Sequence, residues 1–187
     1  MNTHALILAA GKGSRFGFAK AWIEHNEQSL LQSHLDILLP LMEVSVVVSS
    51  QNDIPPQQLF RVVENNDGTD MMSSIRKGVT SLSAHTEVLI VPVDTIPQKM
   101  ETITTLLQKK APAVLAHQGK PGHPILLTVE SILSLAENQT LKDIVSTAQQ
   151  CESDISCIYN INRPQDWEEI FGRPAKRWNN NNHPKIR

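Results

Sequence analysis

The sequence has almost no charge imbalance and no long apolar run, and both absences narrow its range of functions. Its formal net charge is −2 over 187 residues, so no overall field would attract nucleic acid or an anionic membrane, and anion binding has to be local. The longest apolar stretch, residues 35–48, is interrupted by Pro40 and Glu43 and is too short to span a bilayer. The apolar run that starts at Ala5 has no basic segment before it and no cleavage site after it, which argues against a signal peptide. We therefore expect neither a nucleic-acid partner nor a membrane partner.

Cysteine is also scarce. The chain has two cysteines, Cys151 and Cys157, and their spacing matches neither a Cys-x-x-Cys motif nor a zinc site. Inert, structural cysteines are typical of a reducing compartment, which predicts a cytoplasmic protein.

Strand-like and helix-like patterns alternate along the chain, which predicts an α/β fold. β-branched or apolar runs indicate strands at 5–8, 44–49, 60–63, 88–93, 113–117, 125–129 and 155–161. Residues 118–124 are expected to form the loop between the strands at 113–117 and 125–129. Helical spacing of apolar residues indicates helices at 29–41, 71–82, 101–110, 131–137, 141–149 and 164–171. We expect three layers around a mixed, mainly parallel sheet in one domain, residues 1–172. Residues 173–187 hold five basic residues, no acidic ones and an asparagine run, which predicts a flexible tail.

The segment 6–20, LILAAGKGSRFGFAK, carries the strongest functional signal. An apolar strand leads into a loop with three glycines and three cations: Gly11, Gly13, Gly17, Lys12, Arg15 and Lys20. Glycines let backbone N–H groups approach phosphate oxygens, and the cations neutralise their charge, so the loop is suited to a polyphosphate. It has neither the Walker spacing nor the dinucleotide fingerprint. A solvated turn with surface cations is an equal explanation of the loop taken alone.

Several later segments, taken in order with this loop, resemble one family. They are Lys20-Ala-Trp-Ile with Ser29-Leu-Leu, Asn66 with MMSSIRKG at 71–78, Val91-Pro-Val-Asp94, Gly122-His-Pro-Ile-Leu, and Asn160-Ile-Asn-Arg-Pro-Gln-Asp166. The chain resembles nucleotidyltransferases of the GT-A-like (nucleotide-diphospho-sugar transferase) fold over residues 5–171. Within these it is most similar to the molybdenum cofactor cytidylyltransferases and guanylyltransferases.

The resemblance implies transfer of a nucleoside monophosphate from an NTP with release of pyrophosphate. The backbone of residues 11–14 would cradle the β- and γ-phosphates, Arg15 would clamp phosphate oxygens, and Lys20 would stabilise charge at the α-phosphate. Ser74 would contact the base or cap a helix. The implied catalytic residues are Lys20, Arg15 and Asp94, and the implied nucleotide site is Leu8, Ala9, Ala10, Gly11, Lys12, Gly13, Ser14, Arg15, Lys20, Asn66 and Ser74.

Asp94 follows an apolar strand, so its carboxylate is expected at the carboxyl edge of the sheet, where ligands of open α/β sheets bind. A carboxylate with few other protein ligands suits Mg²⁺, the cofactor we expect. Asp94 as a helix N-cap is the alternative. Asn160 is expected as the second metal contact, or as part of a turn.

The second substrate is less defined by sequence. Gly122 and His123 are expected to contact a phosphorylated acceptor, which the resemblance implies is molybdopterin, with a molybdoenzyme or its chaperone as a partner. Ala10 stands where the guanylyltransferases tend to carry glycine, which favours CTP over GTP. Departures from the family pattern at Asp70, after Asp94 and at Asn160 keep two alternatives open. These are a nucleotidyltransferase acting on a sugar 1-phosphate or other small phosphate, and a non-catalytic nucleotide-binding homologue.

Overall fold

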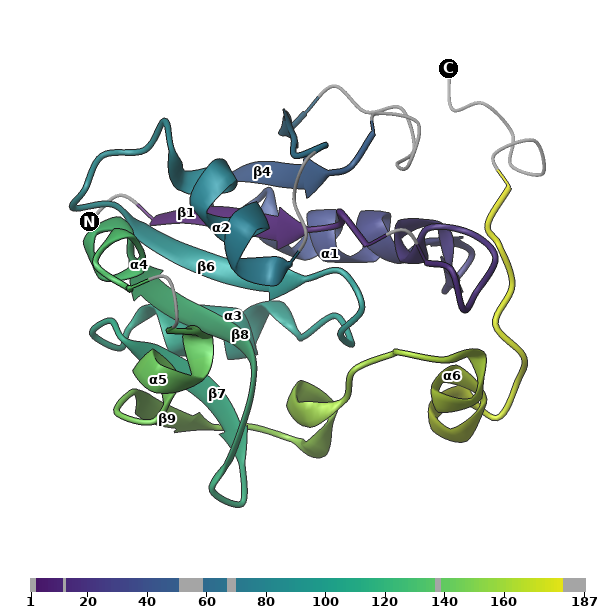
Figure 1. Ribbon diagram of the computed structural model, residues 1–187. Coiled ribbons are helices and arrows are strands. Elements are labelled where there is room, and N and C mark those ends of the chain that lie inside the picture. Colours follow the sequence, from purple (N-terminus) through teal and green to yellow (C-terminus); the bar gives the residue numbers. More distant parts are fainter. Residues whose placement is uncertain (1–2, 12, 51–58, 67–69, 137–138, 180–187) are drawn as a thin grey trace.

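A seven-stranded mixed sheet forms the centre of the protein, seen in a computed structural model that describes residues 3–11, 13–50, 59–66, 70–136 and 139–179 (Figure 1). The strand order is β5-β4-β1-β6-β8-β7-β9. Four of the six neighbouring pairs are parallel, and β8 runs antiparallel to both of its neighbours. The expected mixed, mainly parallel α/β sheet is confirmed. The strands are β1 (Thr3–Leu8), β4 (Glu43–Val48), β5 (Arg61–Glu64), β6 (Glu87–Pro92), β7 (Ala113–His117), β8 (Lys120–Thr128) and β9 (Gln149–Glu152).

Helices cover both faces of this sheet and make three layers. Because side chains alternate along a strand, β1 directs Ala5 and Ile7 into one core and Leu6 and Leu8 into the other. The first core is closed by α1 (Leu30–Leu38) and α3 (Met100–Leu107), and the second by α2 (Met71–Val79), α4 (Val129–Leu133) and α5 (Leu141–Val145). None of the helices in the described residues is long and apolar enough to cross a membrane.

A smaller cluster lies beside the main sheet. Ile23, Leu30, Ile161 and Trp167 are buried together. It joins the short helix η1 (Lys20–Trp22) and the hairpin β2 (Glu24–His25) and β3 (Gln28–Ser29) to α6 (Pro164–Phe171). This cluster holds the segment around Lys20 against α6.

Three expectations for local structure are wrong. Residues 155–161 are not a strand: Ile155–Ile158 form the 3-10 helix η3, because the Asp154 carboxylate accepts the Ser156 N–H and starts a turn. The helix expected at 141–149 ends at Val145, and Gln149–Glu152 becomes β9, which pairs in parallel with β7. Gly122 and His123 lie inside β8 rather than in a loop, because Gln118 and Gly119 have positive φ and close a two-residue hairpin turn.

The first part of the expected tail lies along the hairpin region. The Glu24 N–H donates to the Lys176 carbonyl, and the Trp178 N–H donates to the Trp22 carbonyl. The Trp178 ring stacks on Trp22 with 6.0 Å between ring centroids. Residues 173–179 are thus bound to the domain, and residues 180–187 lie outside the described part of the chain.

Candidate active site

Asp94 and Lys20, 74 positions apart in sequence, form an ion pair. Lys20 begins η1, and its Nζ donates to Asp94 Oδ2 at 2.7 Å. Both side chains are partly shielded from solvent, at 17% and 26% exposure, so the pair is less screened than a surface salt bridge. Asp94 follows β6 at its carboxyl end, the edge at which ligands of open α/β sheets bind.

A tight turn presents Asp94 at this edge. The Thr95 hydroxyl donates to the Pro92 carbonyl at 2.8 Å, and the Thr95 N–H donates to the same carbonyl at 3.2 Å. From the other side, the Ile161 N–H donates to the Asp94 carbonyl at 2.7 Å. Asn160 pairs with Thr95 in an isolated antiparallel bridge. The backbone bridge therefore places Asn160 next to the turn after Asp94, whereas the cavity that Asn160 lines is a separate one on the α6 side.

A cavity of about 280 Å³ opens next to the ion pair. It is lined by residues at and after the end of β1, at the start of α2, and at and after the end of β6: Leu8, Ala10, Gly11, Asp70, Met71, Ser74, Pro92 and Asp94. Five residues of the expected site share it, namely Leu8, Ala10, Gly11, Ser74 and Asp94. Ala9 instead points into the core on the opposite face, and its N–H donates to the Val47 carbonyl.

The glycine-rich loop has a structural constraint of its own. Gly13 has φ +60°, and a Cβ there would lie 1.8 Å from the Phe18 carbonyl oxygen. The Phe16 N–H donates to the Gly13 carbonyl at 2.8 Å and closes the turn. Ser14 and Arg15 are exposed on this turn and do not line the cavity. Lys12, also expected at the nucleotide, lies outside the described residues.

The start of α2 is held by a residue that the sequence did not single out. Asn65 is buried after β5 and donates from Nδ2 to the hydroxyls of Ser73 and Ser74, at 3.1 and 3.2 Å. The Asp70 carboxylate caps the helix by accepting the Ser73 N–H at 2.7 Å. Asn66, the residue expected from the sequence, is exposed next to Asn65. Because the two asparagines are adjacent and chemically identical, the sequence does not indicate which of them faces inward.

A second, more apolar cavity of about 440 Å³ adjoins the first. It is lined by residues of β8 and α5 and their neighbours: Met71, Pro121, Gly122, His123, Ile125, Leu141, Lys142, Val145 and Ser146. Met71 lines both cavities. His123 Nδ1 is buried with no hydrogen-bond partner, and burial lowers the pKa of His123, an effect that the Asp94 charge offsets only in part. A Cβ at Gly122 would lie 2.1 Å from the Cys157 carbonyl oxygen, so the glycine itself is needed for packing.

The family profile of the MobA-like NTP transferase domain matches residues 5–153. The chain belongs to this family. It is a nucleotidyltransferase by family, as the sequence motifs predicted. No curated protein sequence matches significantly.

Solved structures of three related proteins share the fold of this NTP transferase domain. Rv0371c from Mycobacterium tuberculosis H37Rv superposes with a TM-score of 0.78 at 13% identity, covering 92% of this chain and 99% of its own. A nucleotidyl transferase from Methanothermobacter thermautotrophicus gives 0.67 at 18% identity, with 90% and 95% covered. The 2-C-methyl-D-erythritol 4-phosphate cytidylyltransferase from Thermus thermophilus gives 0.60 at 19% identity, with 89% and 95% covered. Rv0371c has also been crystallised with manganese.

The oxygen donors near Asp94 fit a hard divalent cation. The described residues contain no cluster of three or more His, Cys, Asp or Glu side chains able to hold a metal. Asp94 offers a carboxylate, and the backbone of Asn160 is bridged to Thr95, the residue that follows Asp94. A carboxylate with few other protein ligands suits Mg²⁺, which takes its remaining ligands from water and substrate phosphates. Asp166 is used elsewhere, because its carboxylate accepts the N–H groups of Asn162 and Arg163 at the start of α6.

Proposed function

We propose that this transferase moves a nucleoside monophosphate from an NTP, with CTP preferred, to a phosphorylated acceptor and releases pyrophosphate. The observation that carries the proposal is the Lys20–Asp94 ion pair, whose Asp94 lines the cavity formed by the glycine-rich loop and the start of α2. At the carboxyl edge of the sheet, the ammonium group would stabilise negative charge on the phosphate, and the carboxylate would bind a divalent cation.

In this mechanism the loop binds the triphosphate and Lys20 acts on the reacting phosphorus. The glycine-rich loop would bind the β- and γ-phosphates through its backbone N–H groups, and Arg15 would close over them from the exposed turn. The Lys20 ammonium stabilises the negative charge that grows on the α-phosphate oxygens. Asp94, with Asn160 as the second expected contact, would hold Mg²⁺, and the ion would supply positive charge to balance the pyrophosphate.

The acceptor would occupy the cavity beyond Met71. An acceptor phosphate is already ionised near neutral pH, so its attack needs no general base. The side chains of Met71, Ile125, Leu141 and Val145 give the cavity an apolar lining, which suits a flat ring better than a short polyol. Lys142 lines the same cavity and would pair with the acceptor phosphate. These features support a pterin-type acceptor such as molybdopterin. A molybdoenzyme partner and a cytoplasmic location stay predictions.

Replacing Lys20 tests the proposal. We expect Lys20→Ala to lower kcat for pyrophosphate release by about 10²–10³-fold, because a preorganised cation at the transition state is lost. Circular dichroism should show an intact fold. Lys110→Ala is the matched control, because Lys110 is an exposed lysine after α3 and should leave kcat unchanged. Near-normal activity of Lys20→Ala would contradict the assignment.

The same assay separates the substrates. Labelled CTP or GTP is offered with molybdopterin, with a sugar 1-phosphate or with 2-C-methyl-D-erythritol 4-phosphate, the acceptor in the name of the Thermus enzyme. Transfer to molybdopterin supports the proposal that the apolar cavity binds a flat ring. Transfer to a polyol phosphate overturns it. NTP binding without transfer to any acceptor would instead indicate a non-catalytic homologue.

A further inference from the structure

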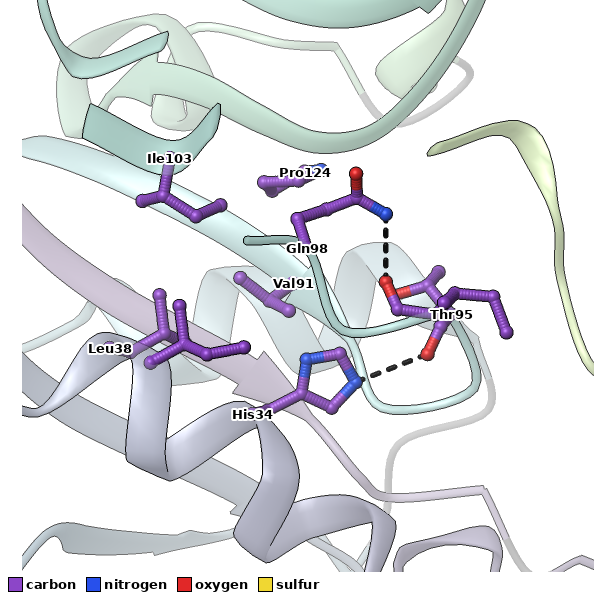
Figure 2. A pocket seen from close by; sticks show the side chains of 9 residues that line it. His34, Leu38, Val91, Thr95, Gln98, Ile103 and Pro124 are labelled. Atoms are coloured by element: carbon purple, nitrogen blue, oxygen red, sulfur yellow. Dashed lines mark hydrogen bonds between the residues drawn. The ribbon is translucent and has the colours of Figure 1, made fainter. Parts of the chain in front are cut away.

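A buried histidine lies directly behind the turn that presents Asp94. His34 belongs to α1 and is 3% exposed. Its Nε2 lies 3.2 Å from the carbonyl oxygen of Thr95, and Figure 2 shows the ring reaching from the helix to this turn. A carbonyl only accepts hydrogen bonds, so Nε2 carries the proton and donates.

An imidazole at this position needs an explanation, because its neighbours on the helix are apolar. Leu31, Leu35 and Leu38 of α1 pack in the main core. Burial lowers the pKa of His34 to about 4, so the ring is neutral and has a single N–H group. Burying a polar ring is costly unless it is hydrogen-bonded. Hydrogen bonding to the backbone of this turn, at Thr95 and also at Val93, therefore offsets the cost of burying histidine at position 34.

The hydrogen bond from His34 acts on Thr95, which is connected to both expected metal contacts, Asp94 and Asn160. Thr95 follows Asp94 in sequence and pairs with Asn160. Its hydroxyl is tied to the Pro92 carbonyl and its own carbonyl to His34. A gap of about 10 Å³, lined by His34, Thr95 and Gln98 among others (Figure 2), is at the lower limit for one water molecule. A water has little room to take over the donor role.

We propose that His34 is a positioning residue for Asp94: its Nε2–H holds the Thr95 carbonyl and fixes the turn that presents the Asp94 carboxylate to Lys20 and a divalent cation. This inference rests on the proposed metal-binding role of Asp94. It assigns His34 no contact with substrate. Its effect reaches the site through the turn at residues 92–95.

Mn²⁺ affinity tests the inference without relying on turnover. The probe is Mn²⁺ added to protein saturated with a non-hydrolysable NTP analogue, measured by electron paramagnetic resonance. We expect His34→Phe, which keeps a ring but has no donor, to weaken Mn²⁺ binding about 10-fold, as is typical for outer-shell partners of a metal site. His34→Gln places an amide N–H near the Nε2 position and should restore most of the affinity.

His4→Phe is the matched control. His4 is also a buried histidine, and its Nε2 hydrogen-bonds Ser45 Oγ at 2.8 Å. It lies near the start of β1, whereas Asp94 follows the end of β6, which runs parallel to β1. We expect His4→Phe to lower the melting temperature without changing Mn²⁺ affinity. Equal affinity losses in His4→Phe and His34→Phe would show a general effect of destabilisation and overturn the inference.

Asp94→Asn distinguishes failure of this inference from failure of the proposed function. If Asp94→Asn binds Mn²⁺ as tightly as the unmodified protein, the metal role of Asp94 is wrong and both proposals fall. If Asp94→Asn loses Mn²⁺ while His34→Phe binds it normally, only the role of His34 is overturned.

A measurement on the unmodified protein applies even if His34→Phe does not fold. With ¹⁵N-labelled histidine, we expect Nε2 of His34 to be protonated and its signal to shift when Mg²⁺ and the NTP analogue bind. The shift should be absent in Asp94→Asn. A His34 signal that does not respond to Mg²⁺ in the unmodified protein would contradict coupling between the ring and the site.

Discussion

At the scale of single residues, the glycine-rich loop contains two glycines with positive φ in different surroundings. Gly13 (φ +60°) lies against the Phe18 carbonyl, whereas a Cβ at Gly17 (φ +75°) would meet nothing within 4 Å. Gly13 is therefore needed both for its backbone conformation and for space, and Gly17 only for its conformation.

Alanine substitutions at Gly13 and Gly17 should distinguish the cost of the backbone conformation from the cost of the missing space. Gly17→Ala is expected to lower the free energy of unfolding by about 1 kcal/mol, the cost of a left-handed alanine. Gly13→Ala adds a clash with backbone and should cost about 2–4 kcal/mol in total, with weaker NTP binding. Urea denaturation measures both. Equal losses at the two positions would contradict the close approach to Phe18.

The residues that the sequence predicted well are those whose placement follows from strand order alone. Asp94 comes directly after a buried strand, so its position at the sheet edge follows from the apolar run before it. Asn65 and His34 could not be found in this way. Which of two adjacent asparagines faces α2 depends on how β5 leaves the sheet. His34 sits in an apolar helical stripe, and its partner is a backbone carbonyl 61 positions away, which no residue pattern reveals.

At the scale of elements, the helix that borders the nucleotide cavity depends on its first turn. The α2 helix begins after Asp70, whose Oδ1 accepts the Ser73 N–H. The same residue lines the cavity. Capping therefore sets where Ser74 and Met71 stand relative to a bound nucleotide.

Removing this cap should destabilise the protein modestly. Asp70→Ala is expected to lower the free energy of unfolding by about 1 kcal/mol, because one N–H at the helix start loses its acceptor. Asp70→Asn keeps an oxygen in the same place and should cost much less. Thermal denaturation compares the two. A loss with Asn as large as that with Ala would mean that the carboxylate charge, rather than the cap, is what matters.

The elements that sequence reasoning misjudged are stabilised by distant partners or by single turns. In β9 only Cys151 of four residues is buried, so the strand shows too little alternation to be recognised, and it exists because β7 offers a parallel edge. Residues 155–161 look like a strand by composition, but Asp154 starts a 3-10 turn there instead. The central strands β1, β4 and β6, buried over almost their whole length, followed directly from the sequence.

At the scale of the whole molecule, segment 173–179 connects the end of α6 back to the Lys20 region. Arg177 pairs with Ile23 and lies over the Trp22 ring, 5.3 Å from its centroid. Trp178 stacks on the same ring and donates from Nε1 to the Glu27 carbonyl. The segment thus supports the helix that carries Lys20.

Trp178→Ala tests this support. We expect it to lower the free energy of unfolding by about 1–2 kcal/mol, because it removes an aromatic pair and the apolar contact area of the ring. It should also raise the KM for NTP, since η1 loses its outer support. Lys176→Ala is the control, because only the backbone carbonyl of Lys176 bonds to Glu24. An unchanged KM and stability in Trp178→Ala would show that the segment rests on the domain without supporting it.

The path of segment 173–179 also has a consequence for biosynthesis. Trp178 and its acceptor Glu27 are 151 positions apart, so Trp22 and Ile23 emerge from the ribosome long before the segment that covers them is made. Until then a nascent chain carries an uncovered tryptophan beside the lysine assigned to the reaction. The support of the Lys20 segment thus depends on a part of the chain that is synthesised about 150 residues later.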